Sequence, residues 1–170
     1  ISDIDTRALT LKIRTNGNPK GLIVSSTEAR LSPAEIDRCI GILAGYPDME
    51  GRDIVSAVQG RSVPAPDGDN NGSNGLHVVL IDFGCKANIV GELQRRGCRV
   101  TVLPASATAG QVREAGAEAV LLSNGPGDPA VLTGPIRLAR RLADRYPLFG
   151  ICLGHQILSL AFGAQTFKMR

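Results

Sequence analysis

The stretch PLFGICLGHQILSLAF, residues 147–162, decides the fold class of this sequence. Residues 147–151 form a short apolar run that predicts a strand, and residues 153–162 predict a helix. Only Cys152 separates the two elements. A strand that passes directly into a helix is typical of α/β folds, in which helices pack against a parallel sheet.

The same alternation of strand and helix continues upstream. Strands are predicted at 77–83 (HVVLIDF), 98–104 (CRVTVLP) and 117–123 (AEAVLLS), and helices at 86–96, 109–115 and 136–144. These strands are apolar almost throughout, which indicates a parallel sheet with helices on both faces. Because ligands bind at the carboxyl ends of such strands, we expect the chemistry in the loops after Phe83, Ser123 and Ile151.

A linker is predicted at residues 61–75 (RSVPAPDGDNNGSNG), where Pro, Gly, Asn, Asp and Ser dominate and no apolar periodicity remains. It separates residues 1–60 from residues 76–170. The first segment predicts two helices and one strand, which are too few elements to bury a core. We therefore expect residues 1–60 to be the C-terminal part of a domain whose beginning lies outside this sequence.

The elements expected in this first segment are a helix at 5–16, a strand at 22–26 (LIVSS) and a helix that begins after Ser32. Ser32 and Glu35 have the spacing of a capping box, in which each side chain accepts a hydrogen bond from the other residue's backbone N–H. Pro33 suits the first helical position. The face of this helix that we expect to be buried carries Ile36, Ile40 and Leu43.

Composition excludes several classes of function. The sequence is 43% hydrophobic and 21% charged, as expected for a soluble globular protein. It has no apolar run near the roughly 20 residues of a membrane span and no signal-like leader, so we expect a cytoplasmic protein with no membrane partner. With four Phe, two Tyr and no Trp, base-stacking surfaces are hard to build, and no nucleic-acid partner is expected. The densest basic cluster lies on the predicted helix 136–144 and just after it. It is more typical of a solvated helix face than of a nucleic-acid-binding surface: Arg137, Arg140, Arg141 and Arg145.

Metal and cofactor sites are not expected either. The sequence has four cysteines, none in a C-x-x-C pair, and two histidines. A cysteine is by default a small buried residue, and Cys39, Cys85 and Cys98 are interpreted in that way. The fourth cysteine differs from them in its surroundings.

Cys152 lies in the pattern Gly150-x-Cys152-x-Gly154, which has the layout of a nucleophile elbow between a strand and a helix. The glycines remove β-carbons that would collide in a tight turn. The turn lifts the cysteine above the sheet edge, where the helix N-terminus favours the reactive thiolate and the backbone N–H of Leu153 can face an oxyanion. The alternative is that Cys152 merely ends a buried strand, but the paired glycines favour a reactive role.

A second motif, NGPGDP at residues 124–129, follows the neighbouring predicted strand. Its two glycines and two prolines predict a rigid loop with exposed backbone N–H groups that could complete an oxyanion hole. A simple turn is the alternative. A phosphate-binding loop is a third possibility, but the G-x-x-x-x-G-K-[ST] pattern is absent.

LSNGPGDP, followed after one helix by PLFGICLGHQ, resembles the class I glutamine amidotransferase superfamily. DIDTRALT at residues 3–10 and DFGCKANI at residues 82–89 make the sequence similar, within it, to the carbamoyl-phosphate synthase small-subunit family. The resemblance covers the whole sequence and implies a flavodoxin-like sheet, incomplete here, preceded by the tail of a small-subunit N-terminal domain. It also implies glutamine hydrolysis, with ammonia passed to a large subunit that holds the ATP and metal.

The resemblance assigns roles to individual residues. Cys152 matches the nucleophile that attacks the amide of L-glutamine and forms a thioester. Gly125 and Leu153 match the backbone donors of the oxyanion hole. Gly125, Gly127, Leu153 and Gln156 match positions that bind glutamine.

A cysteine hydrolase needs a catalytic base, which is normally a histidine oriented by a carboxylate, and the sequence offers no clear candidate. His77 falls at the amino end of a strand, and His155 is expected to point into the packing of its helix, so neither is a convincing base. The resemblance implies a His and a Glu from a later segment, and we expect these 170 residues alone to turn over glutamine poorly. Another class I amidotransferase, a thiol hydrolase of another α/β type, or a non-catalytic module of the same fold remain alternatives.

Overall fold

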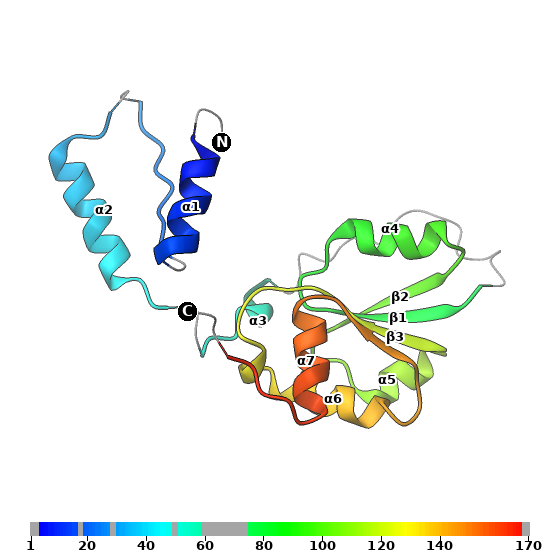
Figure 1. Cartoon of the computed structure of the whole chain (residues 1–170). Helices are drawn as coiled ribbons and strands as arrows, with labels where there is room; N and C mark the ends of the chain where they lie inside the picture. Colours follow the sequence, from blue (N-terminus) through cyan, green and yellow to red (C-terminus); the bar gives the residue numbers. More distant parts are fainter. Residues whose placement is uncertain (1–3, 17–18, 28–29, 49–50, 59–74, 168–170) are drawn as a thin grey trace. The chain divides into compact units, whose positions relative to one another are not determined.

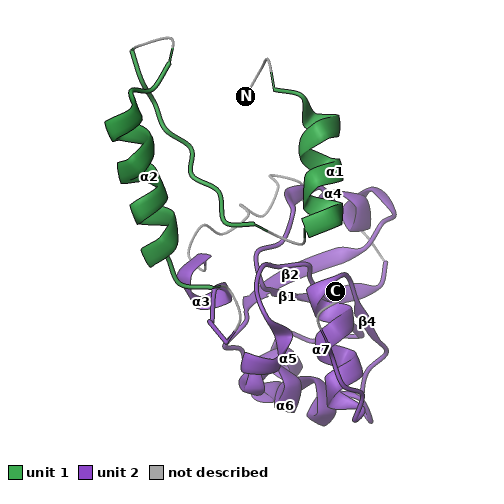
Figure 2. Cartoon of the chain, turned by 60° about the vertical axis from the view of Figure 1, so that its left-hand side comes forward, with its two compact units in different colours: residues 1–48, 168–170 green, residues 49–167 purple. Residues whose placement is uncertain are grey.

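The structure is a computed structural model that describes residues 4–16, 19–27, 30–48, 51–58 and 75–167. The chain forms two compact units, residues 1–48 with 168–170 and residues 49–167 (Figure 2). Most of the linker predicted at 61–75 lies outside the described residues.

The second unit is built on a four-stranded parallel sheet with strand order β2-β1-β3-β4. Its strands are β1 (His77–Asp82), β2 (Arg99–Pro104), β3 (Ala119–Leu122) and β4 (Leu148–Gly150). In the register, Ile81 pairs with Leu122, and Leu122 pairs with Gly150. The carboxyl ends of β1, β3 and β4 therefore lie level at one edge, in the strand order of flavodoxin-like folds.

Helices cover both faces of this sheet, as the apolar strands predict. Helix α4 (Ala87–Arg95) lies on one face, and α5 (Ala109–Glu114), α6 (Thr133–Leu142) and α7 (Leu153–Ala161) lie on the other (Figure 1). Strand β1 shows why: Val79 and Ile81 pack into the α5–α7 cluster, whereas Val78 and Leu80 pack under α4. Because successive side chains point to opposite faces, a strand buried on both sides must be apolar at every position.

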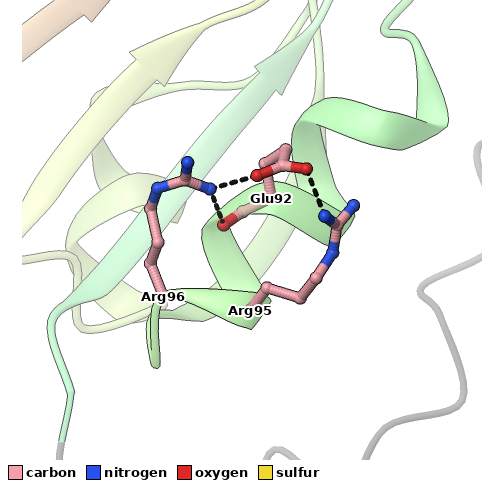
Figure 3. A network of polar contacts seen from close by, with 3 residues as sticks. All are labelled: Glu92, Arg95 and Arg96. Carbon is pink, nitrogen blue, oxygen red and sulfur yellow. Dashed lines mark hydrogen bonds and ion pairs between the residues drawn. The ribbon is translucent and has the colours of Figure 1, made fainter.

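Helix α4 presents charged residues beside its buried stripe. Glu92 forms ion pairs with Arg95 and Arg96, and an Arg96 guanidinium nitrogen also donates to the Glu92 carbonyl oxygen at 3.0 Å (Figure 3). The Arg96 hydrogen bond is the main cause of a lowered pKa at Glu92. Such exposed pairs at i,i+3 and i,i+4 stabilise a helix only weakly, because solvent screens them.

The sequence prediction placed the start of one helix too late and missed one short element. Helix α6 begins at Thr133 rather than at residue 136, because Pro135 is tolerated in a first helical turn, where its missing N–H has no partner to lose. The short 3₁₀ helix η1 (Pro129–Val131) was not predicted, although Asp128 accepts a capping hydrogen bond from the Ala130 N–H at 2.9 Å.

The first unit confirms the two predicted helices, α1 (Thr6–Asn16) and α2 (Pro33–Gly45). The capping box between Ser32 and Glu35 is present, and the hydrogen bonds from Ser32 lower the pKa of Glu35.

The strand predicted at 22–26 was wrong, since these residues form no ladder with any described segment. The buried face predicted for α2 was also wrong, because Ile36 and Ile40 are 45% and 57% exposed and Leu43 is only half-buried. Both errors have one cause. The apolar pattern of the sequence predicts which side chains would be buried against a neighbouring element, and the described part of this unit contains no element that buries them.

Residues 51–58 belong to the second unit, although the sequence groups them with the first segment. They include the short helix α3 (Val55–Val58), which was not predicted. Val55 is 1% exposed and lies in the α5–α7 core cluster.

None of the helices in the described ranges has both the length and the apolar composition that a membrane span requires.

Candidate active site

The turn between β4 and α7 holds Cys152 in an unusual backbone conformation, with φ 53° and ψ −110°. It is the only non-glycine residue with positive φ in the described part of the chain. Backbone strain of this kind costs on the order of 1–3 kcal/mol and clusters at functional sites. Cys152 is exposed and is the N-cap residue of α7, so its thiol lies at the sheet edge beside the start of a helix.

The glycines on either side are required by close backbone contacts. A Cβ on Gly150 would lie 2.5 Å from the Gly154 carbonyl carbon, and a Cβ on Gly154 would lie 2.1 Å from the Leu122 carbonyl oxygen. The Gly154 N–H also donates to the Ser123 carbonyl oxygen at 3.0 Å. The start of α7 is therefore pressed directly onto the end of β3, which gives the elbow its sharp bend.

The loop at residues 124–129 lies against this elbow. A Cβ on Gly125 would lie 2.4 Å from the Phe83 carbonyl oxygen and 2.8 Å from Leu153 Cδ2. Gly125 thus fits between the end of β1 and the first residue of α7 only because it has no side chain. The two sequence motifs, separate along the chain, meet here.

The described structure pairs no acceptor with the backbone N–H groups of Gly125, Gly127 and Leu153. Leu153 is the first residue of α7, where a helix leaves its N–H groups without intrahelical partners. Gln156 lies one turn further on the same helix and is exposed. Backbone donors and an exposed amide near a cysteine form a site that can receive a carbonyl oxygen.

Two residues that sequence reasoning missed hold the loop in place. The Asn124 side chain accepts from the Lys86 N–H and donates to the Gly84 carbonyl oxygen, each at 3.1 Å. Ser123 is fully buried, and its hydroxyl accepts from the Phe83 N–H at 2.9 Å. The signal was present in the sequence, since short polar side chains at the ends of buried strands commonly hydrogen-bond to neighbouring backbone groups.

The loop after β1 is organised by Asp82, whose carboxylate accepts from the backbone N–H groups of Gly84 and Cys85 at 2.8 and 2.7 Å. Burial raises the pKa of the Cys85 thiol from 9.0 to about 11, and the Asp82 charge adds to the increase. Cys85 is buried as predicted, whereas Cys39 and Cys98 are only partly buried.

Neither histidine forms a hydrogen bond with Cys152 in the described part of the chain. His77 begins β1, at the opposite edge of the sheet, and its ring nitrogens lie 3.0 Å from the Gly116 carbonyl oxygen and 2.9 Å from Thr101 Oγ1. His155 is exposed rather than packed, contrary to the prediction, because its position on α7 faces away from the Leu153 and Ile157 stripe.

An apolar groove of about 730 Å³ opens elsewhere, between α4 and the strands β3 and β4, and is lined in part by Ile89, Leu93, Leu121 and Phe149. Its lining includes neither Cys152 nor the loop at 124–129, so it is separate from the elbow site. Within the described ranges, no group of three or more His, Cys, Asp or Glu side chains could hold a metal ion.

Comparison with known proteins gives consistent matches. Residues 79–170 match the family described as "Glutamine amidotransferase class-I". Over its whole length the chain is 39% identical to the carbamoyl phosphate synthase pyrimidine-specific small chain of Lactiplantibacillus plantarum, and it covers 43% of that protein. It is 43% identical to the carbamoyl phosphate synthase small chain of Rubrivivax gelatinosus, again over its whole length and 47% of the relative.

The chain thus spans about half the length of the curated relatives it matches. Among solved structures, a GMP synthase subunit from Thermoplasma acidophilum superposes over 53% of this chain and 46% of its own, with a TM-score of 0.46 and 23% identity. The family match covers more than half of the 170 residues, including both motifs of the elbow site. This chain therefore belongs to the class I glutamine amidotransferase family.

Proposed function

We propose that this chain is part of the small subunit of a carbamoyl-phosphate synthase and carries the nucleophile half of its glutaminase site. The observation that supports this is the extent of the similarity. The family match begins at residue 79, yet the chain is 39–43% identical to carbamoyl phosphate synthase small chains over its entire length. The segment before the amidotransferase region is shared as well, which favours this function over another class I amidotransferase.

In the proposed reaction, the Cys152 thiolate attacks the side-chain carbonyl carbon of L-glutamine and a C–S bond forms. The carbonyl oxygen becomes an oxyanion, which the N–H groups of Gly125 and Leu153 stabilise. Collapse of this intermediate breaks the C–N bond, and the nitrogen leaves as ammonia after taking up a proton. Water then attacks the thioester, which releases glutamate and restores the thiolate.

The remaining binding contacts are assigned to the same edge of the sheet. Gly127 and Gln156 would hold the glutamine together with Gly125 and Leu153. The ammonia would pass to a large synthetase subunit, which we propose as the partner and as the holder of ATP and metal. We assign no cofactor to this chain and place the complex in the cytoplasm.

The proton transfers need a histidine within hydrogen-bond reach of the reacting groups, and in the described structure neither His77 nor His155 forms a hydrogen bond with Cys152. We therefore propose that these 170 residues alone turn over glutamine slowly or not at all. Steady-state glutaminase activity of this isolated chain at the rate of a complete small subunit would contradict that proposal.

The experiment that tests the function is covalent labelling with a glutamine-like chloroketone, read by intact mass, on the complete gene product and on Cys152→Ala. One adduct that is absent in the variant and slowed by excess glutamine is expected. Labelling that persists in the variant, or that glutamine does not slow, would favour the alternatives, a different thiol hydrolase or a non-catalytic module.

A further inference from the structure

Residues 51–58, which precede the undescribed segment at 59–74, lie against the loop that carries Gly125 and Gly127. A Cβ on Gly127 would lie 3.4 Å from Ile54 Cβ and 3.7 Å from Ile54 Cγ1. The Arg52 carbonyl oxygen would lie 3.8 Å from the same point. The Gly51 N–H donates to Asp128 Oδ2 at 3.4 Å. Three separate positions of this segment therefore lie close to one short loop.

The same segment reaches the second loop of the site. A Cβ on Gly84 would lie 3.1 Å from Pro126 Cδ and 3.6 Å from Val58 Cγ2. Pro126 and Val58 therefore both lie beside the space into which a side chain at residue 84 would project. The segment thus lies beside the loop at 124–129 near Gly127 and beside the loop after β1 near Gly84.

A segment can position a loop only if it is itself fixed. Val55 is 1% exposed in the core below the sheet, which anchors the segment at its centre. The Asp53 carboxylate accepts from both the backbone N–H and the hydroxyl of Ser56, and these bonds lower the pKa of Asp53. Ile54 is half-buried between this anchor and Gly127.

We propose that residues 51–58 act as a brace for the glutamine-binding loop, with Ile54 as the positioning residue that fixes Gly127 and, through the rigid loop, Gly125. This inference rests on the proposed function. Gly127 has φ 97°, so only a glycine adopts its conformation without strain. Ile54 occupies the space beside Gly127 into which a side chain at that position would project.

The test uses the complete gene product and compares Ile54→Ala with Ile54→Val. Valine keeps Cβ and Cγ1, the two atoms that approach Gly127, whereas alanine keeps only Cβ. The matched control is Val90→Ala, which removes two methyl groups from a 1% exposed residue on the other face of the sheet. The readouts are KM and kcat for glutamine, the rate of chloroketone labelling at Cys152, and the thermal midpoint of each variant.

We expect Ile54→Ala to raise KM for glutamine and slow labelling by about tenfold, because small displacements of positioning groups have effects of this size or larger. Ile54→Val and Val90→Ala should stay within about twofold of wild type once their thermal midpoints are taken into account. If Ile54→Ala does not fold, Val58→Ala replaces it, with the same direction of change expected.

Equal KM values in Ile54→Ala, Ile54→Val and Val90→Ala would overturn the brace and leave the proposed function intact. An unchanged KM in Val58→Ala, where that variant replaces Ile54→Ala, would do the same. A wild-type gene product that neither hydrolyses glutamine nor labels at Cys152 would overturn the proposed function instead.

Discussion

At the scale of single residues, Cys152 combines a reactive side chain with an unfavourable backbone. Its conformation, φ 53° and ψ −110°, is one that glycine adopts readily and other residues do not. Cys152→Gly is therefore expected to be more stable than Cys152→Ala by about 1 kcal/mol, since alanine keeps the β-carbon that causes the strain. Urea denaturation of both variants measures the difference, and a glycine variant that is no more stable would mean that the turn is unstrained.

Cys85 has the opposite character. Its thiol has a pKa of about 11, raised by burial and by Asp82, so at pH 8 iodoacetamide should modify Cys152 and leave Cys85 unmodified. The folded state favours the neutral thiol. Its contribution to stability is therefore complete below pH 9 and is lost as the pH rises from 9 to about 11.

Peptide mapping by mass spectrometry distinguishes the two cysteines. Cys85→Ala is the control for the pH effect, because it should flatten the loss of stability between pH 9 and 11. Rapid modification of Cys85 at pH 8 in the folded protein would contradict this prediction.

At the scale of elements, the packing of α7 on β3 depends on the absence of a side chain at residue 154. A Cβ there would lie 2.1 Å from the Leu122 carbonyl oxygen, so Gly154→Ala must separate the helix from the strand. We expect a loss of about 1–3 kcal/mol in the free energy of unfolding, together with loss of chloroketone labelling. The matched control is Gly134→Ala in α6, where a Cβ meets nothing within 4 Å and should cost no stability.

The elements also show which features could be read from the sequence. The four strands were predictable because they carry apolar runs, and the helices α4, α5 and α7 because each ends close to a glycine with positive φ, such as Gly97 at φ 80°. Helix α6 was predictable from its amphipathic pattern. Helix α3 was not, because four residues hold too little periodicity to detect. Nor could the sequence tell that Ile54 packs against Gly127, because that contact joins residues far apart in the chain and depends on the folded register.

The candidate site was predictable only where its features are local in the sequence. The pattern around Cys152 is local, and its glycines point to a tight turn. The contributions of Ser123 and Asn124 are not local, since each bonds to backbone groups of the loop after β1. Their residue types are common at strand ends, and only the parallel pairing of β1 with β3 gives them a partner.

At the scale of the whole molecule, the two units differ in how much apolar surface they bury. Strand β1 is buried on both faces, whereas neither α1 nor α2 has a buried residue. We expect backbone amides of β1 to exchange with solvent only on global unfolding, and those of α1 and α2 to exchange through local opening at much lower free energy.

Hydrogen exchange read by mass spectrometry measures this contrast in the 170-residue chain. Ile40→Ala, at a 57% exposed position, should change the unfolding of the sheet by less than about 0.5 kcal/mol. Ile157→Ala, at a fully buried position, should cost about 2–5 kcal/mol. Slow exchange throughout α1 and α2 would show that these helices are covered in solution.

The contact between Gly154 and the Leu122 carbonyl also bears on how this sequence can vary over evolution. Any single-nucleotide change that turns a glycine codon into the codon of another amino acid introduces a β-carbon. At residues 125, 150 and 154 that carbon would lie within 2.5 Å of another backbone atom. Selection for a folded elbow is enough to fix these three positions, even in a lineage that had lost its substrate. Retention of the two glycines in Gly-x-Cys-x-Gly therefore shows only that the fold is kept. Retention of the cysteine between them is what indicates that the catalytic chemistry is kept.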